Sequence, residues 1–267
     1  MNEPSPTTLI AHRGESEDAP ENTLPAYRTA VGRGFGFECD CYLSADRKVF
    51  MFHDPDLART TAGACTKACG EATWDEIRDL DVGGWGRWAG SAFSGTKPAL
   101  LEEVLPLARD GRRIYLELKP GPEIVPYVKA ILAAQGAATP DNLLFIAFNR
   151  ATCRALKEAM PGFDAYLLLS SRHWDRPRGP DGAAPPVTAD EALAALDESR
   201  ADGLDFHFDP AVATAEMMAR VHATGRSFHV WTIDDLPTAL EAFRRGADTV
   251  TTNCAQRLLD EYAAAAT

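Results

Sequence analysis

Residues 36–53 read GFECDCYLSADRKVFMFH, and they combine a strand pattern with acidic residues set inside an apolar run. Within residues 36–43, Glu38 and Asp40 are two positions apart, so both side chains point to the same face of a strand. The neighbouring cysteines then point to the opposite face, toward covering helices. Residues 48–53 alternate in strand fashion and are predicted to pair close to the strand at residues 36–43. This stretch therefore predicts a strand that carries two carboxylates on one face.

Strand-like and helix-like segments alternate from this stretch toward both ends of the chain. The other segments with a strand pattern are residues 8–11, 113–118, 142–148, 164–169, 203–208, 227–232 and 247–251. The segments with a helical pattern are residues 24–32, 123–135, 151–159, 188–198, 213–224, 236–245 and 254–264. Asn22 or Thr23 is a natural cap for the first of these helices.

Eight strand-then-helix units in 267 residues predict an α/β fold, the (β/α)8 TIM barrel. A doubly wound open sheet is the main alternative. Such a sheet does not usually need eight units, and it would need a Gly-rich phosphate loop after the first strand. The sequence at that place, IAHRGESEDAPEN over residues 10–22, is not a loop of this kind.

Two stretches interrupt this rhythm. Residues 55–98 contain one short helical signal, at 73–80, and are predicted to form an inserted subdomain over the barrel mouth. Residues 170–187 are rich in Pro, Gly, Arg and Asp, so they form either a functional loop or a solvated connector. The sequence thus predicts one barrel domain over residues 1–267 with a small insertion at about 55–98.

The net charge of −12 argues against a nucleic-acid partner, but it does not exclude a small anionic substrate. The first residues show no secretory signal, and no apolar run is long enough for membrane insertion. A cytoplasmic location is therefore expected, and the oligomeric state stays open. The six cysteines are expected to be free thiols, because they are scattered along a long chain without a secretory signal. Zinc binding is not expected at Cys65 and Cys69, which lack a second pair of soft ligands.

Short polar patches lie at or near the ends of the predicted strands. Glu38 and Asp40 share a face of one strand, and Glu117 precedes Lys119 at the end of another. Buried carboxylates are costly unless they are paired or bind a metal. Three carboxylates without a neighbouring Cys or His ligand favour one hard divalent cation, Mg²⁺ or Ca²⁺. The alternative is that the three acids are ion-pair partners of nearby cations such as Arg13.

His12 and His53 each follow an apolar run and are candidates for proton exchange on opposite sides of a phosphorus. Arg13 and Lys119 are candidates for holding phosphate oxygens, with charge balance as their alternative role. Glu21 either orients Arg13 or a metal-bound water, or merely decorates the turn before the first helix.

Four further side chains are weaker candidates for the same site. Trp231 ends a strand pattern and is a candidate floor for the substrate pocket, with ordinary barrel packing as the alternative. His207, at the end of another strand, is expected to be a packed or capping residue. Trp85 and Trp88 are expected to hold the insertion to the barrel as an apolar plug, although contact with a substrate tail is the alternative.

The patches resemble the glycerophosphodiester phosphodiesterase family. The segments IAHRG, APENT, FECDCYLSADRKVFMFHD and LELKP match its signatures in order, and GRSFHVWTIDD and GADTVTTN resemble its last two strands. The resemblance implies a barrel with one divalent cation that cleaves a glycerophosphodiester, a small-molecule substrate, into an alcohol and sn-glycerol 3-phosphate. In some members a glycerol hydroxyl attacks first and gives a cyclic phosphate.

The same resemblance implies a role for each of seven residues. Glu38, Asp40 and Glu117 match the metal ligands. His12 and His53 match the acid and base, in an order that stays open. Arg13 and Lys119 match the phosphate contacts.

Three positions depart from the family pattern and leave the leaving-group pocket in doubt. Asp234 stands where Asn is common, Asn253 where Asp is common, and Ala147 where Ser is usual. Alternatives to the implied activity are a lysophospholipase D or sphingomyelinase D-like enzyme, for which the polar 170–187 loop is a poor fit, and a non-catalytic phosphate-ester-binding barrel. A sugar-phosphate isomerase or aldolase barrel would want a Schiff-base Lys or a Gly-rich site on the last two strands, and neither is clear.

Overall fold

Eight parallel strands close into a barrel in the computed structural model, which describes residues 2–109, 111–173, 175–179 and 182–265. The barrel strands are β1 (Leu9–Ala11), β2 (Gly36–Leu43), β4 (Ile114–Leu118), β5 (Leu143–Ala147), β6 (Ala165–Leu169), β7 (Gly203–His207), β8 (Ser227–Trp231) and β9 (Thr249–Thr252). Strand β1 pairs in parallel with both β9 and β2, which closes the barrel. The TIM-barrel prediction is confirmed, and an open doubly wound sheet is excluded.

A ninth strand lies outside the barrel. Strand β3 (Val49–Met51) pairs antiparallel with β2, with Cys41 opposite Met51. The predicted pairing of this segment with residues 36–43 is confirmed, although the strand ends two residues before His53. His53 therefore lies in the loop that leads out of β3 toward the barrel mouth.

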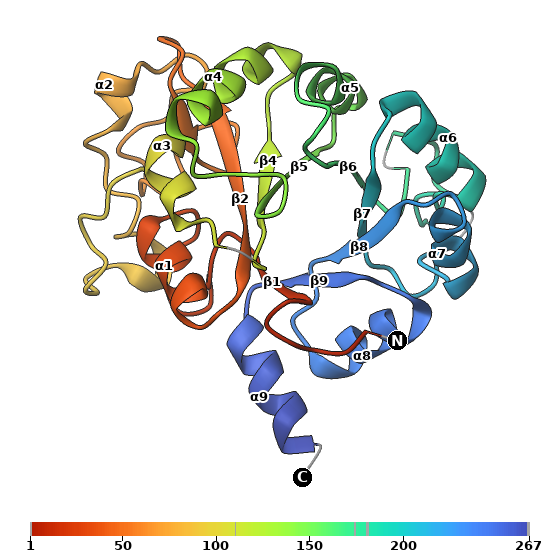
Figure 1. The fold of residues 1–267 in the computed structure, drawn as a ribbon. Helices are drawn as coiled ribbons and strands as arrows, with labels where there is room; N and C mark the ends of the chain where they lie inside the picture. The colour runs from red at the N-terminus through yellow and green to blue at the C-terminus, as the bar shows by residue number, and fades with distance from the viewer. Residues whose placement is uncertain (1, 110, 174, 180–181, 266–267) are drawn as a thin grey trace.

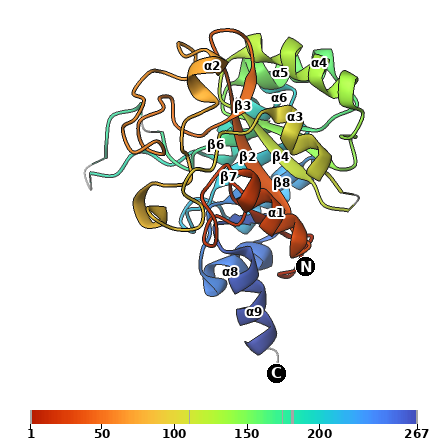
Figure 2. The ribbon, with the colours of Figure 1, turned by 90° about the vertical axis from the view of Figure 1, so that its left-hand side faces the viewer.

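Helices surround the strands in Figure 1, and each long one follows a barrel strand in the chain. These helices are α1 (Leu24–Gly32), α4 (Val125–Gln135), α5 (Arg150–Ala159), α6 (Ala189–Ser199), α7 (Ala215–His222), α8 (Leu236–Arg245) and α9 (Ala255–Ala265). Figures 1 and 2 both show α9 pointing away from the barrel, with the C-terminus at its far end.

Short helices complete the ring. They are α2 (Trp74–Ile77), α3 (Leu101–Val104) and the 3-10 helices η1 (Gly86–Trp88), η2 (Leu105–Leu107) and η3 (Pro122–Ile124). Helix α3 contacts both α1 and α4, so it occupies the second helical place around the barrel. The sequence did not predict it, because four residues followed by Pro106 are too short for a periodic pattern.

The start of α1 resolves the choice between the two candidate caps. Thr23 is the cap, since its side chain accepts a hydrogen bond from the Ala26 N–H. Asn22 instead turns into the barrel: its Nδ2 donates to Asp40 Oδ2 at 2.7 Å, and its Oδ1 accepts from the Asp40 N–H at 3.0 Å. Asn22, which precedes the cap, therefore fixes the orientation of the Asp40 carboxylate on β2.

Apolar side chains form two layers, one between the strands and the helices and one inside the barrel. Cys39 and Cys41 belong to the layer between strands and helices, as the alternation predicted. The layer inside the barrel contains Ile10, Tyr115, Leu144, Ile146, Tyr166 and Leu168, with Trp231 packed against it. All six cysteines are free thiols, which confirms that expectation. Across the described ranges, no helix is long and apolar enough to span a bilayer.

The segment of residues 55–98 packs on its own apolar cluster, which includes Phe50 and Phe52 from the β3 region and Leu57, Ile77 and Val82. Arg87 fastens it to the loop after β1, because its guanidinium donates to the carbonyl oxygens of Ser16 and Glu17 at 2.6 and 2.8 Å. The segment is thus attached on the side of the barrel where β1 ends.

The two tryptophans of this segment each make a cation–π contact, and Trp88 also packs edge-to-face against Phe93. The Arg59 guanidinium lies 4.9 Å from the Trp85 ring centroid, and that of Arg87 lies 4.5 Å from the Trp88 centroid.

Gly14 makes a turn after β1 that other residues cannot make without strain. Its φ is +79°, and a Cβ built there would lie 2.6 Å from the Ala26 carbonyl carbon in α1. The Gly14 N–H donates to the carbonyl oxygens of Ala11 and Glu38, both at 3.2 Å. The turn thus places the residues after β1 against both α1 and β2.

We expect Gly14→Ala to lower the free energy of unfolding by roughly 2–5 kcal/mol, because a strained φ and an overlap with α1 add together. Gly63→Ala is the matched control: its φ is +81° but no atom lies within 4 Å of the added Cβ. That change should cost only about 1–2 kcal/mol. Urea unfolding of both variants measures the difference, and equal losses would show that the close approach at Gly14 is unimportant.

Candidate active site

Three buried carboxylates gather where β2 and β4 approach the mouth of the barrel. Asp40 on β2 lies opposite Glu117 on β4, and Glu38 lies one inward-facing position earlier on β2. One oxygen from each of the three acids lies within 4.8 Å of the other two. Their exposed fractions are 4% for Glu38, 1% for Asp40 and 7% for Glu117, so water does not screen their mutual repulsion well.

The protein partners of these acids leave one oxygen free. Glu38 Oε2 accepts the Arg13 backbone N–H at 2.9 Å, whereas Glu38 Oε1 is buried without a hydrogen-bond partner among the described residues. Lys119 Nζ lies 2.9 Å from Asp40 Oδ1 and 2.8 Å from Glu117 Oε1. The ion-pair alternative is therefore realised for two of the acids, but it leaves Glu38 without a side-chain cation at hydrogen-bonding distance in the part of the chain that is described.

Burial and mutual repulsion oppose ionisation of this cluster. Burial raises the pKa of Glu38 well above its usual value, and the charges of Asp40 and Glu117 add to the rise. Burial, then the charge of Asp40, raises the pKa of Glu117 to about 8. Burial acts on Asp40 in the same direction, but Lys119 and Arg13 outweigh it and hold the pKa of that carboxyl well below its usual range. The protein alone does not provide enough positive charge to ionise all three acids at neutral pH.

A hard divalent cation fits this donor set. Carboxylate oxygens are the ligands that Mg²⁺ and Ca²⁺ prefer, and neither a thiolate nor an imidazole belongs to the cluster that the described residues form. The unpartnered Glu38 oxygen is the atom that such an ion would satisfy. The arrangement of Glu38, Asp40 and Glu117 can therefore hold a metal ion.

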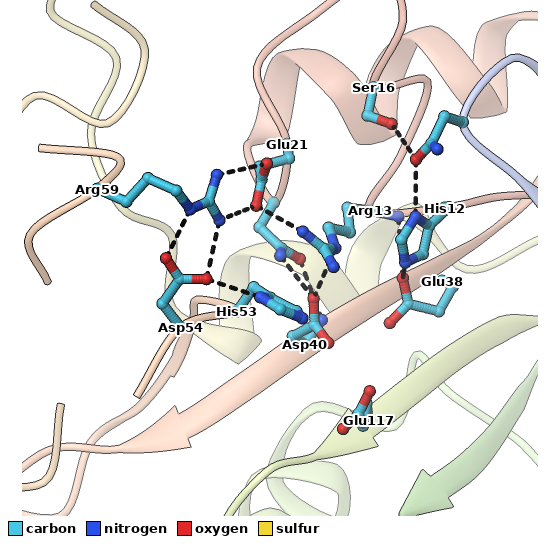
Figure 3. Close-up of polar contacts among 12 residues, drawn as sticks. His12, Arg13, Ser16, Glu21, Glu38, Asp40, His53, Asp54, Arg59 and Glu117 are labelled. Atoms are coloured by element: carbon cyan, nitrogen blue, oxygen red, sulfur yellow. Dashed lines mark hydrogen bonds and ion pairs between the residues drawn. The ribbon is translucent and has the colours of Figure 1, made fainter. Parts of the chain in front are cut away.

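His12 stands beside Glu38 (Figure 3). A hydrogen bond with Asn253 orients its ring. Asn253 Nδ2 donates to Asp234 Oδ2 at 2.7 Å, so the amide oxygen faces His12 Nδ1 at 2.7 Å and that nitrogen carries the proton. The other ring nitrogen, Nε2, lies 3.9 Å from Glu38 Oε2. Burial and then the charge of Arg13 lower the pKa of His12 to about 4. His12 is therefore neutral at pH 7, with an unprotonated nitrogen near the acids.

His53 is oriented by a carboxylate instead of an amide. Its Nδ1 lies 2.8 Å from Asp54 Oδ1, and Arg59 donates to both oxygens of Asp54 at 2.6 and 2.9 Å. The hydrogen bond from Arg59 lowers the pKa of Asp54 to about 2. Burial lowers the pKa of His53, although the nearby charge of Asp40 opposes the shift. In the view of Figure 3, Asp40 and the Arg13 guanidinium lie between the two imidazoles.

Glu21 links the two cations at the mouth. Its carboxylate accepts from Arg13 at 2.8 Å and from Arg59 at 2.7 and 3.0 Å. Arg13 has a φ of +57°, which turns its side chain back over the acids, and its Nε is 3.5 Å from Asp40 Oδ2. Of the two uses considered for Glu21, orientation of Arg13 is the one that these contacts support.

The acids and histidines line one cavity of about 190 Å³. The residues around it are His12, Arg13, Glu38, Asp40, His53, Glu117, Lys119, Ile146, Phe148, Leu168, Asp205, Trp231, Thr232 and Thr251. Trp231 packs edge-to-face against Phe148, with centroids 5.8 Å apart, and its Nε1 donates to the Asp205 carbonyl oxygen at 3.1 Å. His207 is not among the lining residues; its Nδ1 is 2.9 Å from Ser171 Oγ, in keeping with a packed role.

The structure adds residues that the sequence did not single out for the site. Asn22, Arg59 and Asp54 orient predicted residues, and Phe148, Asp205 and Thr251 line the cavity. Asp54 and Asn22 stood inside the quoted patches, so an adjacent signal existed for them. The sequence pattern did not indicate Asp205, because a single acidic residue in a predicted strand is common and its spatial neighbours cannot be read from the sequence.

Comparisons of this chain with known protein families and relatives agree with the geometry of the site. The profile of the "Glycerophosphoryl diester phosphodiesterase family" matches residues 12–256. A glycerophosphodiester phosphodiesterase of Caldanaerobacter subterraneus subsp. tengcongensis is 32% identical over 166 residues, 61% of this chain and 66% of that protein. One from Bacillus subtilis is 24% identical over 246 residues, 87% of this chain and 78% of that protein.

Among solved structures, an Oleispira antarctica phosphodiesterase in complex with the product sn-glycerol-3-phosphate matches with a TM-score of 0.79. It is 26% identical, and the match covers 96% of each chain. The alignments with the first two curated relatives span 66% and 46% of those proteins' own lengths, which is less than two thirds.

The raised pKa of Glu117, about 8, gives cation binding a defined pH dependence. Between its unfolded pKa and about pH 8 the folded protein binds the extra proton, so the cation-free fold loses stability as pH rises through this window. A divalent cation replaces that proton, and we expect Mg²⁺ or Ca²⁺ to raise Tm more at about pH 9 than at about pH 6. Thermal unfolding with each ion, with and without chelator, measures the effect.

The Glu117→Gln variant should lose most of this response, whereas Asp75→Asn, at an acid whose side chain is 80% exposed on α2, should keep it. A cation-induced rise in Tm that is the same in both variants would place the ion elsewhere.

Proposed function

We propose that this chain, which belongs to the glycerophosphoryl diester phosphodiesterase family, hydrolyses glycerophosphodiesters to an alcohol and sn-glycerol 3-phosphate with one divalent cation. The observation that carries the proposal is the meeting of two imidazoles, three acids and two cations in one cavity. Those side chains come from β2, β4 and the residues that follow β1, β3 and β4, and they are the groups that metal-assisted attack on a phosphate ester needs.

Glu38, Asp40 and Glu117 hold the cation in this proposal, and Mg²⁺ and Ca²⁺ both suit their oxygens. When bound, such an ion polarises phosphoryl oxygens and orients the attacking hydroxyl group. Arg13 and Lys119 offset the negative charge of the phosphate, with Arg13 kept in place by Glu21. The net charge of the site then stays close to balance when an anionic substrate enters.

His12 is the proton acceptor in this proposal. Its proton is on Nδ1, toward Asn253, so Nε2 is free to take a proton from the glycerol hydroxyl group that attacks phosphorus as the leaving alkoxide departs. A water molecule then opens the resulting cyclic phosphate to give sn-glycerol 3-phosphate. Its pKa of about 4 keeps Nε2 unprotonated at neutral pH. Asp234 acts one step further back, because it fixes the orientation of the Asn253 amide. The two departures from the family pattern, Asp234 and Asn253, are thus partners of each other.

His53 is the proton donor to the leaving alkoxide. The Asp54 carboxylate beside its Nδ1 stabilises the imidazolium form that a donor must adopt. Arg59 keeps that carboxylate ionised, since it donates to both of its oxygens. The side chain of His53 is 32% exposed, against 17% for His12, which suits contact with a leaving group that extends toward solvent.

The substrate class that we propose is a small glycerophosphodiester, not a lysolipid or a nucleic acid. The cavity of about 190 Å³ and the polar groups around it suit a small polar substrate such as a glycerol phosphate. The net charge of −12 supports a small-molecule partner over a polynucleotide. We also propose a single barrel domain over residues 1–267 with residues 55–98 as its insertion. Six free thiols support a reducing, cytoplasmic compartment.

The proposal is tested with glycerophosphocholine, glycerophosphoethanolamine and lysophosphatidylcholine, each incubated with Mg²⁺ or Ca²⁺ and with chelator. We expect free choline or ethanolamine together with sn-glycerol 3-phosphate, and no release when the metal is removed. Product identity is measured by mass spectrometry. Phosphocholine as the product would mean cleavage on the other side of phosphorus, and faster turnover of the lysolipid would favour the lysophospholipase D alternative.

The two histidines should respond differently to the leaving group. We expect His12→Ala to lose roughly 10²–10⁴-fold in kcat with both glycerophosphocholine and the 4-nitrophenyl ester of glycerol phosphate. His53→Ala should lose as much with glycerophosphocholine but much less with 4-nitrophenolate, which leaves without protonation. His222→Ala is the control, because His222 on α7 pairs with Asp248 and does not line the cavity. The opposite pattern would exchange the two roles.

A further inference from the structure

Two buried oxygens in the catalytic cavity have no role in the proposed chemistry. Asp205 Oδ1 and Thr251 Oγ1 both lack a hydrogen-bond partner within the described ranges, and each residue is 2% exposed. Both residues line the cavity that holds the acids and the histidines. Buried polar groups are normally paired, so an unpaired one that faces a cavity indicates a ligand or water that completes it.

The barrel geometry directs both side chains inward. Leu204 and Phe206 flank Asp205 on β7 and pack in the layer between strands and helices, so Asp205 points to the opposite side, into the barrel. Val250 packs in the same outer layer, which turns Thr251 of β9 inward as well. The two side chains therefore come from alternate barrel strands, where layers of inward-facing residues are shared.

Asp205 forms no ion pair with any residue that the structure describes. Burial alone raises the pKa of Asp205 to about 7, with no charged neighbour contributing. It is also outside the acidic cluster of Glu38, Asp40 and Glu117 that the described residues form. A buried carboxyl group without a partner lowers the free energy of unfolding and stabilises no other part of the structure. Such groups are commonly found where a ligand binds.

The surroundings of this pair indicate what it binds. Ile146 and Leu168 provide apolar walls, and Phe148 and Trp231 provide aromatic ones. A carbon skeleton with hydroxyl groups matches these walls together with a carboxyl acceptor and a Thr hydroxyl group. A phosphate would repel the Asp205 carboxylate, and a quaternary ammonium group would leave the Thr251 hydroxyl group unpaired, because it has no hydrogen to donate and no lone pair.

We propose that Asp205 and Thr251 form a hydroxyl-binding subsite that holds the terminal hydroxyl group of the substrate's glycerol moiety. This inference rests on the proposed function, and it assigns the glycerol side of the diester to the floor of the cavity. The leaving alcohol then lies toward the mouth, near His53. Selection for glycerol over other alcohols follows from an unpaired acceptor that a substrate without the hydroxyl group cannot satisfy.

The test compares two 4-nitrophenyl phosphate diesters, one of glycerol and one of 1,2-propanediol joined through its primary oxygen. The second lacks only the terminal hydroxyl group and keeps the hydroxyl group next to the reacting centre. We expect the wild type to prefer the glycerol ester by about 10- to 100-fold in kcat/KM. The Asp205→Asn and Thr251→Val variants should lose most of this preference, because kcat/KM for the glycerol ester falls much more than kcat/KM for the propanediol ester.

A matched control and a folding check accompany these variants. Thr249→Val removes a buried hydroxyl group from the same strand, but Thr249 bonds to His229 and does not line the catalytic cavity, so the preference should persist. Asp205→Asn should unfold at the same or a higher Tm, because it removes an unpaired buried acid. A direct binding measurement with sn-glycerol 3-phosphate and propanediol phosphate should show the same loss of discrimination.

The outcomes separate this inference from the proposed function. Turnover of neither ester by the wild type contradicts the proposed function itself. Equal losses with both esters in the variants, or an unchanged preference, overturn the subsite. A change in the preference for glycerophosphocholine over a glycerophosphodiester with an uncharged alcohol, with the hydroxyl preference intact, assigns Asp205 to the leaving group instead and also overturns it.

Discussion

Repulsion among three buried carboxylates is the constraint around which the barrel mouth is organised. Glu38, Asp40 and Glu117 each bring an oxygen within 4.8 Å of the other two, in a place where water cannot screen them. Lys119 and the side chain of Arg13 compensate part of this charge, and the Arg13 backbone N–H compensates another part. The negative charge that they leave uncompensated is charge that a cation can offset. A barrel with fewer buried acids would be more stable, but it would offer a cation fewer ligands.

The two histidines have different neighbours, which suit the two different tasks that we propose for them. An amide beside His12 fixes the tautomer of the ring without adding charge. A carboxylate beside His53 both fixes the ring and favours its cationic form. Asp234 and Arg59 stand behind these neighbours, and each holds its partner in one orientation. The division of roles thus depends on residues that do not touch the substrate in the proposed reaction.

The fold was predictable from sequence because each barrel strand has an inside and an outside that differ in polarity. The alternation in GFECDCYL was enough to place two acids inside and two cysteines outside. The helix α3 was missed because four residues carry no period, and the choice between Asn22 and Thr23 as a cap could not be made without β2 beside them. Predicted strand ends also differ by one or two residues from those observed, since hydrogen bonding to the neighbouring strand sets them.

Much of the site was visible in the sequence as side chains at strand ends, and its supporting contacts were not. The acids and histidines lie in motifs, whereas Arg59 reaches Glu21 across 38 residues and Asn253 reaches His12 across 241. No sequence motif indicated Asp205, because its distinguishing feature is that Oδ1 lacks a hydrogen-bond partner within the described structure. Pattern reading finds the groups that do chemistry more readily than the groups that orient them.

The distribution of the thiols has a practical consequence. Five of the six cysteines are buried, and Cys65 in the inserted segment is the exception. Cys39 and Cys41 lie on the strand that carries two of the acids, yet they face the helices, and burial raises the pKa of each thiol. An alkylating reagent or a mild oxidant therefore meets Cys65 first, and Cys65 does not line the catalytic cavity. The chain thus has a single natural position for attaching a spectroscopic label while the catalytic groups stay untouched.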